Sequence, residues 1–262
     1  MRYAKARTGI GMDEVLVEQS DGVLRLILNR PEALNALNPP LLTKLTAAIR
    51  KASDDRGVGV IVLSGAGRAF SAGVDLKLLK SMTFEAGRLG GAFDGEAAEA
   101  ARAIRRCAKP VIAKVHGACF TGALELTLHC DFIFTTADAK FGDTHAKWGL
   151  RPTWGMSQNL ARAIGVRRAR ELSFTARSFS GADAARWGLA NEALADKPAL
   201  DAHVAARAGE IAAGSRGAIS AYKKLYMLHE ENRPLEEALA TEVELDFPEI
   251  DDTRERLEGF GR

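Results

Sequence analysis

The sequence predicts an α/β protein in which strands and helices alternate and a run of helices follows. Apolar segments at residues 58–63 and 111–115 are typical of buried strands, and each leads through a glycine-containing turn into a helical pattern. Beyond Gly155 nearly every segment has the apolar spacing of a helix. This order favours a wound α/β core with right-handed crossovers, followed by a helical C-terminal region.

The first half begins with a predicted hairpin, because Asp21-Gly22 lies between two runs of β-forming residues. Pro31 then marks a loop, and Pro40 opens a helix whose apolar residues share one face. The expected elements are, in order, strands at 15–19 and 23–28, a loop at 29–35, a helix at 40–51, a strand at 58–63, a helix from 76, a glycine-rich break at 82–95 that is a candidate mobile flap, and a helix at 96–106.

The second half is mostly helical. The expected elements are strands at 111–115 and 132–135 and helices at 123–129, 156–164, 167–175, 182–187, 199–213, 219–228 and 235–245. We divide the chain into an α/β core at 1–200 and a helical C-terminal region at 201–262, whose alanine-rich faces suit self-association.

The composition is that of an ordinary soluble globular protein. The chain has 262 residues, is 47% hydrophobic and 27% charged, and has a net charge of +2. Because positive and negative charges nearly balance, the net charge does not favour binding to nucleic acid or to an anionic membrane. No apolar run is long enough to cross a bilayer, and residues 1–7 lack the apolar core of a secretory signal, so we expect a cytoplasmic protein.

The cysteines predict neither a disulfide framework nor a metal site. The chain has three, Cys107, Cys119 and Cys130, and their spacing matches no zinc pattern. An odd, sparse set is typical of reduced thiols in a reducing compartment, and we expect buried small residues at these positions.

The residues with the most chemical potential lie in the two glycine-containing turns, at 70–75 and 122–125. A turn from a strand into a helix can direct a free backbone N–H at a ligand oxygen, and two such turns can form an oxyanion hole. Glu125 follows Gly122 by one helical turn, where it can serve as a general base. A solvated surface position is the alternative for Glu125, but its apolar flanks favour a buried catalytic role.

Several ordered segments resemble the crotonase (enoyl-CoA hydratase/isomerase) family. Residues 28–37 read LNRPEALNAL and resemble its opening signature, and residues 69–76 read AFSAGVDL and resemble its first oxyanion turn. The segment from His116-Gly117 to Cys130-Asp131 resembles its second turn and catalytic helix. The resemblance runs from about residue 15 to a tail at 251–260 that looks like a shortened form of the family's tail.

The resemblance implies a spiral of ββα turns with a helical C-terminal trimerisation region, and a trimer or a dimer of trimers. It implies an acyl-coenzyme A thioester whose carbonyl is bound by the N–H groups of Val74 and Gly122. The Ala72 carbonyl would accept from the adenine amino group, and the loop at 30–33 would lie along the pantetheine and phosphates. The expected substrate-binding positions are Arg30, Ala33, Ala72, Gly73, Asp75, Gly117 and Asp143.

The chain departs from the family at its second catalytic glutamate. Hydratases of the family carry that residue in a segment like Phe-Gly-x-x-Glu, whereas residues 141–145 here read FGDTH, which puts His145 at the position. A histidine titrates near neutrality and can donate the second proton. Asp143 is a weaker substitute, or orients His145 if both lie on a strand. The alternative is a hydrogen-bonded loop without chemistry.

The leading functional hypothesis is an enoyl-CoA hydratase, with Glu125 as base and His145 as acid. Because one matched glutamate suffices to shuttle a proton, a double-bond isomerase is the alternative, as are another acyl-CoA lyase or hydrolase and a non-catalytic acyl-CoA-binding protein. Neither a metal nor a separate cofactor is expected. Trp148 and Trp154 bracket the His145 segment, where we expect them to shape the acyl pocket.

Overall fold

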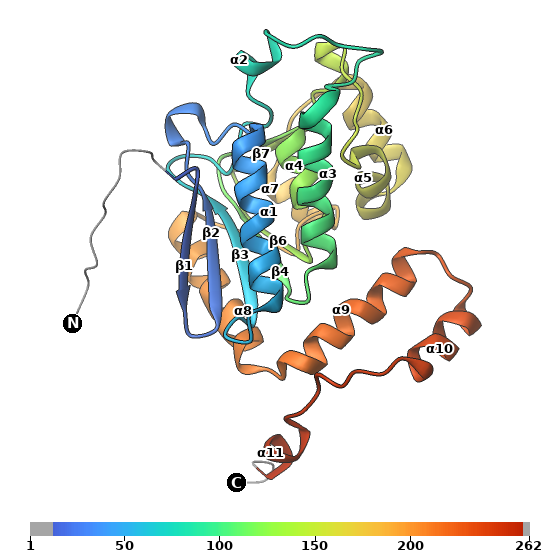
Figure 1. Cartoon of the computed structure of the whole chain (residues 1–262). Coiled ribbons are helices and arrows are strands. Elements are labelled where there is room, and N and C mark those ends of the chain that lie inside the picture. Colours follow the sequence, from blue (N-terminus) through green and yellow to red (C-terminus); the bar gives the residue numbers. More distant parts are fainter. Residues whose placement is uncertain (1–12, 259–262) are drawn as a thin grey trace, which may run out of the picture.

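The computed structural model describes residues 13–258, and two β-sheets form its centre (Figure 1). The larger sheet has the order β1-β2-β3-β4-β6-β9 and the smaller one β5-β7-β8. The strands are β1 (Val15–Ser20), β2 (Val23–Leu28), β3 (Val60–Gly65), β4 (Val111–Val115), β5 (Ala118–Phe120), β6 (Phe132–Thr136), β7 (Lys140–Gly142), β8 (Phe179–Ser180) and β9 (Glu192–Leu194). The segment at 1–7 and the last residues of the predicted tail lie outside the described residues.

Helices surround these sheets and continue beyond them. They are α1 (Pro39–Asp54), α2 (Leu76–Leu79), α3 (Gly91–Arg106), α4 (Gly122–Thr127), α5 (Met156–Ile164), α6 (Val166–Thr175), α7 (Gly181–Arg186), α8 (Lys197–Ala213), α9 (Arg216–Glu230), α10 (Leu235–Glu244) and α11 (Thr253–Glu258), with short 3-10 turns at Pro31–Ala33 and Ala146–Trp148.

The central strands of the larger sheet are buried on both faces. It is parallel from β2 to β9, and only the hairpin partner β1 is antiparallel. Because side chains alternate along a strand, Ile61 and Leu63 of β3 belong to the main core with α1 and α3, whereas Val60 and Val62 pack with α8. The continuous apolar strands of the sequence are therefore explained by helices on both sides.

The chain winds as a spiral of ββα turns, which confirms the predicted fold. After β4 has joined the larger sheet, β5 joins the smaller one and α4 follows. The next turn repeats this with β6 and β7. Each turn therefore brings a loop at the junction of the two sheets to the same part of the molecule, where the site lies.

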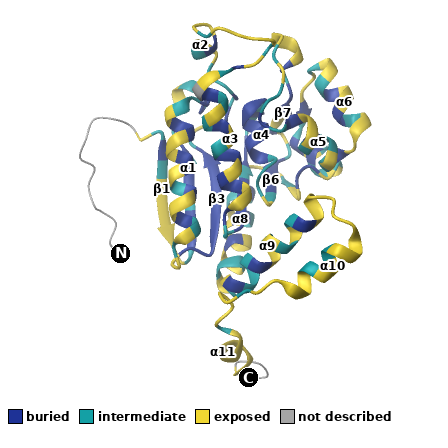
Figure 2. Cartoon of the chain, turned by 45° about the vertical axis from the view of Figure 1, so that its right-hand side comes forward, coloured by how far each residue is buried: buried dark blue, intermediate teal, exposed yellow. Residues whose placement is uncertain are grey.

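The C-terminal helices leave the body of the molecule (Figures 1 and 2). The predicted division at residue 200 lies within α8, which packs on the sheet through Leu200 and Val204. Next comes α9, which is fastened to the core because the Lys223 ammonium donates to the Asp131 carboxylate at 2.7 Å and to the Ile104 carbonyl at 3.1 Å. The helical character of the region is confirmed, and the domain division remains a prediction.

The structure corrects several predicted boundaries. The glycine-rich break ends earlier than expected, because α3 begins at Gly91 and not at residue 96. Gly90 has φ +71° and its N–H donates to the Asp94 carboxylate, so a helix starts within the glycine-rich stretch. The second turn's helix, α4, begins at Gly122 and ends at Thr127, whereas 123–129 was predicted. The short strands β5, β7, β8 and β9 and the helix α11 were not predicted.

Candidate active site

The two glycine-containing turns lie against each other. Gly73 has φ +94°, and a Cβ at this position would lie 2.6 Å from the carbonyl oxygen of Phe120, so only glycine fits. Leu37 is hydrogen-bonded to both neighbours of Val74, which turns the Val74 N–H away from Leu37. Within residues 13–258, neither this N–H nor that of Gly122 donates a hydrogen bond to the protein. Both remain available for an oxygen of a ligand.

The second turn is held by backbone hydrogen bonds and covered by an aromatic ring. The N–H of Thr121 donates to the Gly142 carbonyl at 2.8 Å, and the Thr121 carbonyl accepts from Glu125 at 2.9 Å. A Cβ on Gly122 would lie 2.4 Å from the indole ring of Trp154. Glycine is therefore required at the start of α4, and the ring of Trp154 fixes the position of this turn.

The Glu125 carboxylate is buried; backbone hydrogen bonds hold one of its oxygens, and the other faces His145. Glu125 is 1% exposed, which excludes a surface position. Its Oε1 accepts from the backbone N–H groups of Trp154 and Met156, both at 3.1 Å, and its Oε2 lies 3.6 Å from His145 Nε2. Burial raises the pKa of Glu125 to about 7, although the charge of His145 and the two N–H donors oppose the rise. A carboxyl that titrates near neutrality suits a general base.

His145 faces Glu125 and is held from behind by Asp143. The imidazole Nδ1 lies 2.6 Å from Asp143 Oδ1, which also accepts from the His145 backbone N–H at 3.2 Å. Burial opposes charge on the ring, but the Asp143 hydrogen bond and the charges of Glu125 and Asp143 outweigh it and raise the His145 pKa. Asp143 is itself buried, yet its bonds to His145 lower its pKa.

Asp143 orients His145 through a turn and not, as expected, from a shared strand. Asp143 and His145 do not share a strand, since β7 ends at Gly142. A turn after the strand brings the carboxylate back onto the ring. An ionised carboxylate only accepts, so Nδ1 carries the proton and Nε2 faces Glu125.

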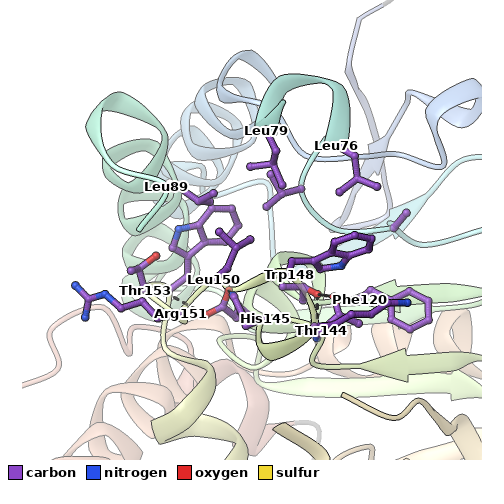
Figure 3. Close-up of a pocket in the computed structure, with 16 residues that line it drawn as sticks. Leu76, Leu79, Leu89, Phe120, Thr144, His145, Trp148, Leu150, Arg151 and Thr153 are labelled. Carbon is purple, nitrogen blue, oxygen red and sulfur yellow. Dashed lines mark hydrogen bonds and ion pairs between the residues drawn. The ribbon is translucent and has the colours of Figure 1, made fainter. Parts of the chain in front are cut away.

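A cavity of about 270 Å³ lies in front of this pair. Figure 3 shows Leu76, Leu79 and Leu89 on one side of it and Thr144 and His145 on the other. Its walls are mainly aliphatic and aromatic, which suits an apolar acyl group. The lining residues are Ala72, Val74, Leu76, Leu79, Leu89, Phe120, Thr121, Glu125, Thr144, His145, Lys147, Trp148, Leu150, Arg151, Thr153 and Trp154. Trp148 and Trp154 both line the cavity, as predicted.

Trp154 is anchored at several points. Its indole Nε1 donates to Asp94 Oδ1 at 3.0 Å, and its ring stacks on Phe93 at a centroid distance of 5.4 Å. Its carbonyl oxygen is 2.8 Å from His129 Nε2, while its N–H holds Glu125. The start of α3 thereby fixes both the ring that covers Gly122 and the segment that orients the base.

Two predicted substrate-binding residues, Arg30 and Asp75, are engaged with each other. The Arg30 guanidinium donates to Asp75 Oδ2 at 2.9 Å and to the Ala36 carbonyl at 2.5 Å. Burial tends to raise the pKa of Asp75, but its hydrogen bonds with Arg30 and with the Lys77 N–H leave it lowered. Asp75 also caps α2 through that N–H. The pair ties the 30–33 loop to the turn that carries Val74.

The remaining predicted substrate-binding positions are Ala72, Ala33 and Gly117. Ala72 lines the cavity, and within the described residues its carbonyl accepts no hydrogen bond from the protein. Ala33 ends the 3-10 turn next to Arg30 and does not line the cavity. Gly117 has φ +61°, and a Cβ there would lie 2.1 Å from the Arg68 carbonyl oxygen, so its requirement is steric. Contact of these residues with a substrate stays a prediction.

Sequence reasoning missed three polar residues of the site, Asp94, Thr121 and Thr144. Asp94 lies in the stretch taken for a glycine-rich break, and its partner Trp154 is 60 positions away. No local spacing signals such a contact. Thr121 precedes the second oxyanion glycine directly, and its closeness to Thr144 follows only from the pairing of β5 with β7.

Within residues 13–258, no cluster of three or more histidine, cysteine, aspartate or glutamate side chains has the arrangement of a metal site. None of the described helices combines the length and the apolar character that crossing a membrane requires. Cys107 and Cys119 are buried and Cys130 is half-buried.

The sequence model of the family described as enoyl-CoA hydratase/isomerase matches residues 18–261. A protein of Rhizobium meliloti named probable enoyl-CoA hydratase is 37% identical over 251 residues, which are 95% of this chain and 93% of that protein. A peroxisomal Delta(3,5)-Delta(2,4)-dienoyl-CoA isomerase of Arabidopsis thaliana is 33% identical over 226 residues, 82% of this chain and 81% of that one.

Solved structures of similar proteins have the same fold. A crystal structure described as an enoyl-CoA hydratase/carnithine racemase from Magnetospirillum magneticum superposes with a TM-score of 0.86. It shares 31% sequence identity, and the match covers 95% of this chain and 93% of that one.

Proposed function

Since the chain belongs to the enoyl-CoA hydratase/isomerase (crotonase) family, we propose that it is an enoyl-CoA hydratase of fatty-acid metabolism, which adds water across the double bond of a 2-enoyl-CoA thioester. The observation that carries the proposal is the pair formed by Glu125 Oε2 and His145 Nε2, 3.6 Å apart at the cavity wall. Hydration needs two proton movements, one from water and one to carbon, and this pair supplies a base and an acid.

The two free N–H groups serve the charge that develops during the reaction. Attack at C3 of the enoyl group pushes electrons onto the thioester oxygen and forms an enolate. The Val74 and Gly122 N–H groups donate to that oxygen in the proposed complex. Fixed donors act when charge develops, and loss of one typically costs about 3 to 4 kcal/mol.

The protons then pass through the facing pair. Glu125 Oε2 takes a proton from water as the water oxygen bonds to C3 and the C2–C3 π electrons move toward the carbonyl. The protonated His145 gives its Nε2 proton to C2, and the enolate electrons return to form the new C–H bond. This leaves Glu125 protonated and His145 neutral. One proton transfer from Oε2 to Nε2 restores the starting state, and Asp143 holds the ring for it.

The chemistry of this proposal requires no metal and no separate cofactor, because coenzyme A is part of the substrate. Ala72 supports the expected adenine contact, since it lines the cavity and its carbonyl accepts no hydrogen bond from the described residues. We place coenzyme A along the 30–33 loop and the Ala72 carbonyl.

A hydration assay tests the proposal. Purified protein is given a short and a long 2-enoyl-CoA, and loss of the enoyl thioester is followed. We expect turnover by the wild type and a fall of about a thousandfold for Glu125→Gln. Exposed Glu18→Gln is the matched control and should keep the wild-type rate. Equal rates for wild type and Glu125→Gln on both substrates would contradict the assignment.

Double-bond isomerisation is the second candidate function. The catalytic pair contains a single glutamate, and a relative at 33% identity is named a dienoyl-CoA isomerase. An isomerase moves a proton between carbons without adding water. A 3-enoyl-CoA substrate in deuterated water distinguishes the two, because the isomerase yields a 2-enoyl-CoA and the hydratase leaves the 3-enoyl-CoA unchanged.

We also propose that the chain forms a trimer, or a dimer of trimers, through its C-terminal helices. Much of α9 and α10 is exposed (Figure 2), and the exposed residues include large apolar ones. They are Tyr222, Tyr226, Leu235, Leu239 and Val243. Exposed apolar surface of this extent on a projecting arm is typical of an interface. Sedimentation equilibrium tests it, and a monomer at all concentrations would contradict it.

A further inference from the structure

Thr121 occupies a backbone conformation that its side chain disfavours. Its φ is +48° and its ψ is −112°, which glycine adopts freely and a β-branched residue does not. Among the described non-glycine residues with positive φ, Thr121 is the only β-branched one. Strain of this kind persists where the surrounding structure fixes the residue, and it is common at functional sites.

The hydroxyl of Thr121 reaches the loop that carries His145. Its Oγ1 is 2.6 Å from Thr144 Oγ1, and it also accepts from the Thr144 backbone N–H at 3.3 Å. Thr144 directly precedes His145, and both threonines line the cavity. The side chain of Thr121 is therefore bonded twice to the segment that presents the acid.

Thr121 is also bonded to the helix of the base and lies beside the first oxyanion turn. Its carbonyl accepts from the N–H of Glu125, and its own N–H donates to Gly142. A Cβ built on Gly73 would lie 3.7 Å from the Cβ of Thr121. One residue thus lies beside the first turn, directly precedes Gly122 of the second, and is bonded to the His145 loop.

We propose that Thr121 is a positioning residue: its hydroxyl, paired with that of Thr144, sets His145 relative to Gly122 and Glu125. The inference rests on the proposed function, because it assigns to His145 the role of acid. Glycine at position 121 would form the turn without strain. What threonine adds is the hydroxyl link between the oxyanion turn and the loop of the acid, at the expense of a strained backbone.

Three variants separate the hydroxyl from the backbone. Thr121→Gly removes the hydroxyl and relieves the strain, Thr121→Ser keeps the hydroxyl, and Thr144→Val removes its partner without touching the turn. Exposed Thr43→Val controls for the loss of a threonine hydroxyl elsewhere. Each variant is measured for kcat and KM in hydration of 2-butenoyl-CoA, for Tm, and for the titration of His145 by NMR. The spectrum of His145→Gln identifies the His145 signal among the five histidines.

We expect kcat to fall about tenfold or more in Thr121→Gly and Thr144→Val, with KM within about threefold, because a displaced acid slows the chemistry and leaves binding intact. The His145 titration should move to lower pH in both variants, as the ring leaves Glu125. Tm of Thr121→Gly should not fall, and Thr121→Ser and Thr43→Val should match the wild type.

Two results would overturn the proposal. One is a Thr121→Gly protein with the wild-type kcat and His145 titration, and the other is a Thr121→Ser protein as impaired as Thr121→Gly. The NMR titration needs no substrate, so it separates this inference from the proposed function. If the wild type hydrates no 2-enoyl-CoA, the hydratase assignment fails, and an unmoved His145 titration in both Thr121→Gly and Thr144→Val still decides against the positioning role.

Discussion

His145 Nε2 lies 3.6 Å from Glu125 Oε2, while the opposite nitrogen of the same ring is bonded to Asp143. The ionisable imidazole ring of His145 therefore lies between the carboxylates of Asp143 and Glu125 in a buried site. The carboxylate pair that the family resemblance implies for a hydratase is thereby replaced by a glutamate and a carboxylate-supported histidine.

The rate of hydration should depend on pH as a bell. The acidic limb reflects Glu125, whose pKa is about 7 and which must be ionised to activate water. The basic limb reflects His145, which must be protonated and whose pKa is raised above its usual 6.5 by Asp143 and Glu125 despite burial. In Asp143→Asn the support is lost, so the basic limb of kcat/KM should move to lower pH. An unmoved limb would show that Asp143 does not support the acid.

The ionisation of Glu125 should make the protein less stable as pH rises, which is the opposite of the effect of a paired surface carboxylate. Burial raises its pKa in the folded protein to about 7, against the usual 4.5, so the folded protein holds the proton more tightly than the unfolded chain. The contribution of this group to stability is present below about pH 4.5 and is lost as pH rises through about 7.

The variant Glu125→Gln removes this loss, because its amide oxygen can still accept from Trp154 and Met156. We expect Glu125→Gln to match the wild type in free energy of unfolding at about pH 4 and to exceed it at about pH 8 by up to about 3 kcal/mol. Thermal unfolding at the two pH values measures it. A lower Tm for the variant at the higher pH would refute the sign.

Gly122 and Trp154 should be energetically coupled. Gly122→Ala places a Cβ 2.4 Å from the indole ring, and such overpacking costs about 1 to 3 kcal/mol. In a Trp154→Leu background the same substitution should cost clearly less, because the ring is absent. Urea unfolding of the four proteins of this cycle gives the coupling free energy. Additive effects would show that the ring does not press on the turn.

Arg30 should affect coenzyme A binding through the loop and not through a phosphate. Its guanidinium is already bonded to Asp75 and to the Ala36 carbonyl. Arg30→Ala should therefore weaken binding of coenzyme A and of dephospho-coenzyme A by the same factor. Calorimetric titration with both ligands measures this. Weakening confined to coenzyme A would instead identify Arg30 as a ligand of the phosphate that the second compound lacks.

The sequence contains enough local information to predict the parts of the site that lie on short spacings. The glycine turns and Glu125 follow from residues within a few places of one another, and the buried strands follow from their continuous apolar runs. The position of His145 follows from the family resemblance. The strands β5, β7, β8 and β9 could not be predicted because each has two or three residues, too few to show the alternation of apolar and polar residues.

Contacts between distant segments could not be predicted in the same way. The bond from Trp154 to Asp94, and that from Thr121 to Thr144, depend on how the spiral brings loops together. The engagement of Arg30 by Asp75 is of the same kind, since 45 positions separate them. Asp143 differs from these cases. The sequence predicts that it orients His145 if both residues lie on a strand, whereas in the structure a turn after β7 brings the two side chains together.

The most direct test of the central claim is the effect of His145→Gln on hydration of 2-butenoyl-CoA at neutral pH, measured together with the dissociation constant of a saturated acyl-CoA. The account predicts that kcat falls by about a hundredfold or more while the dissociation constant stays within about threefold of the wild-type value. A His145→Gln protein that hydrates the substrate at the wild-type rate would contradict it, because the proton at C2 would then come from another group.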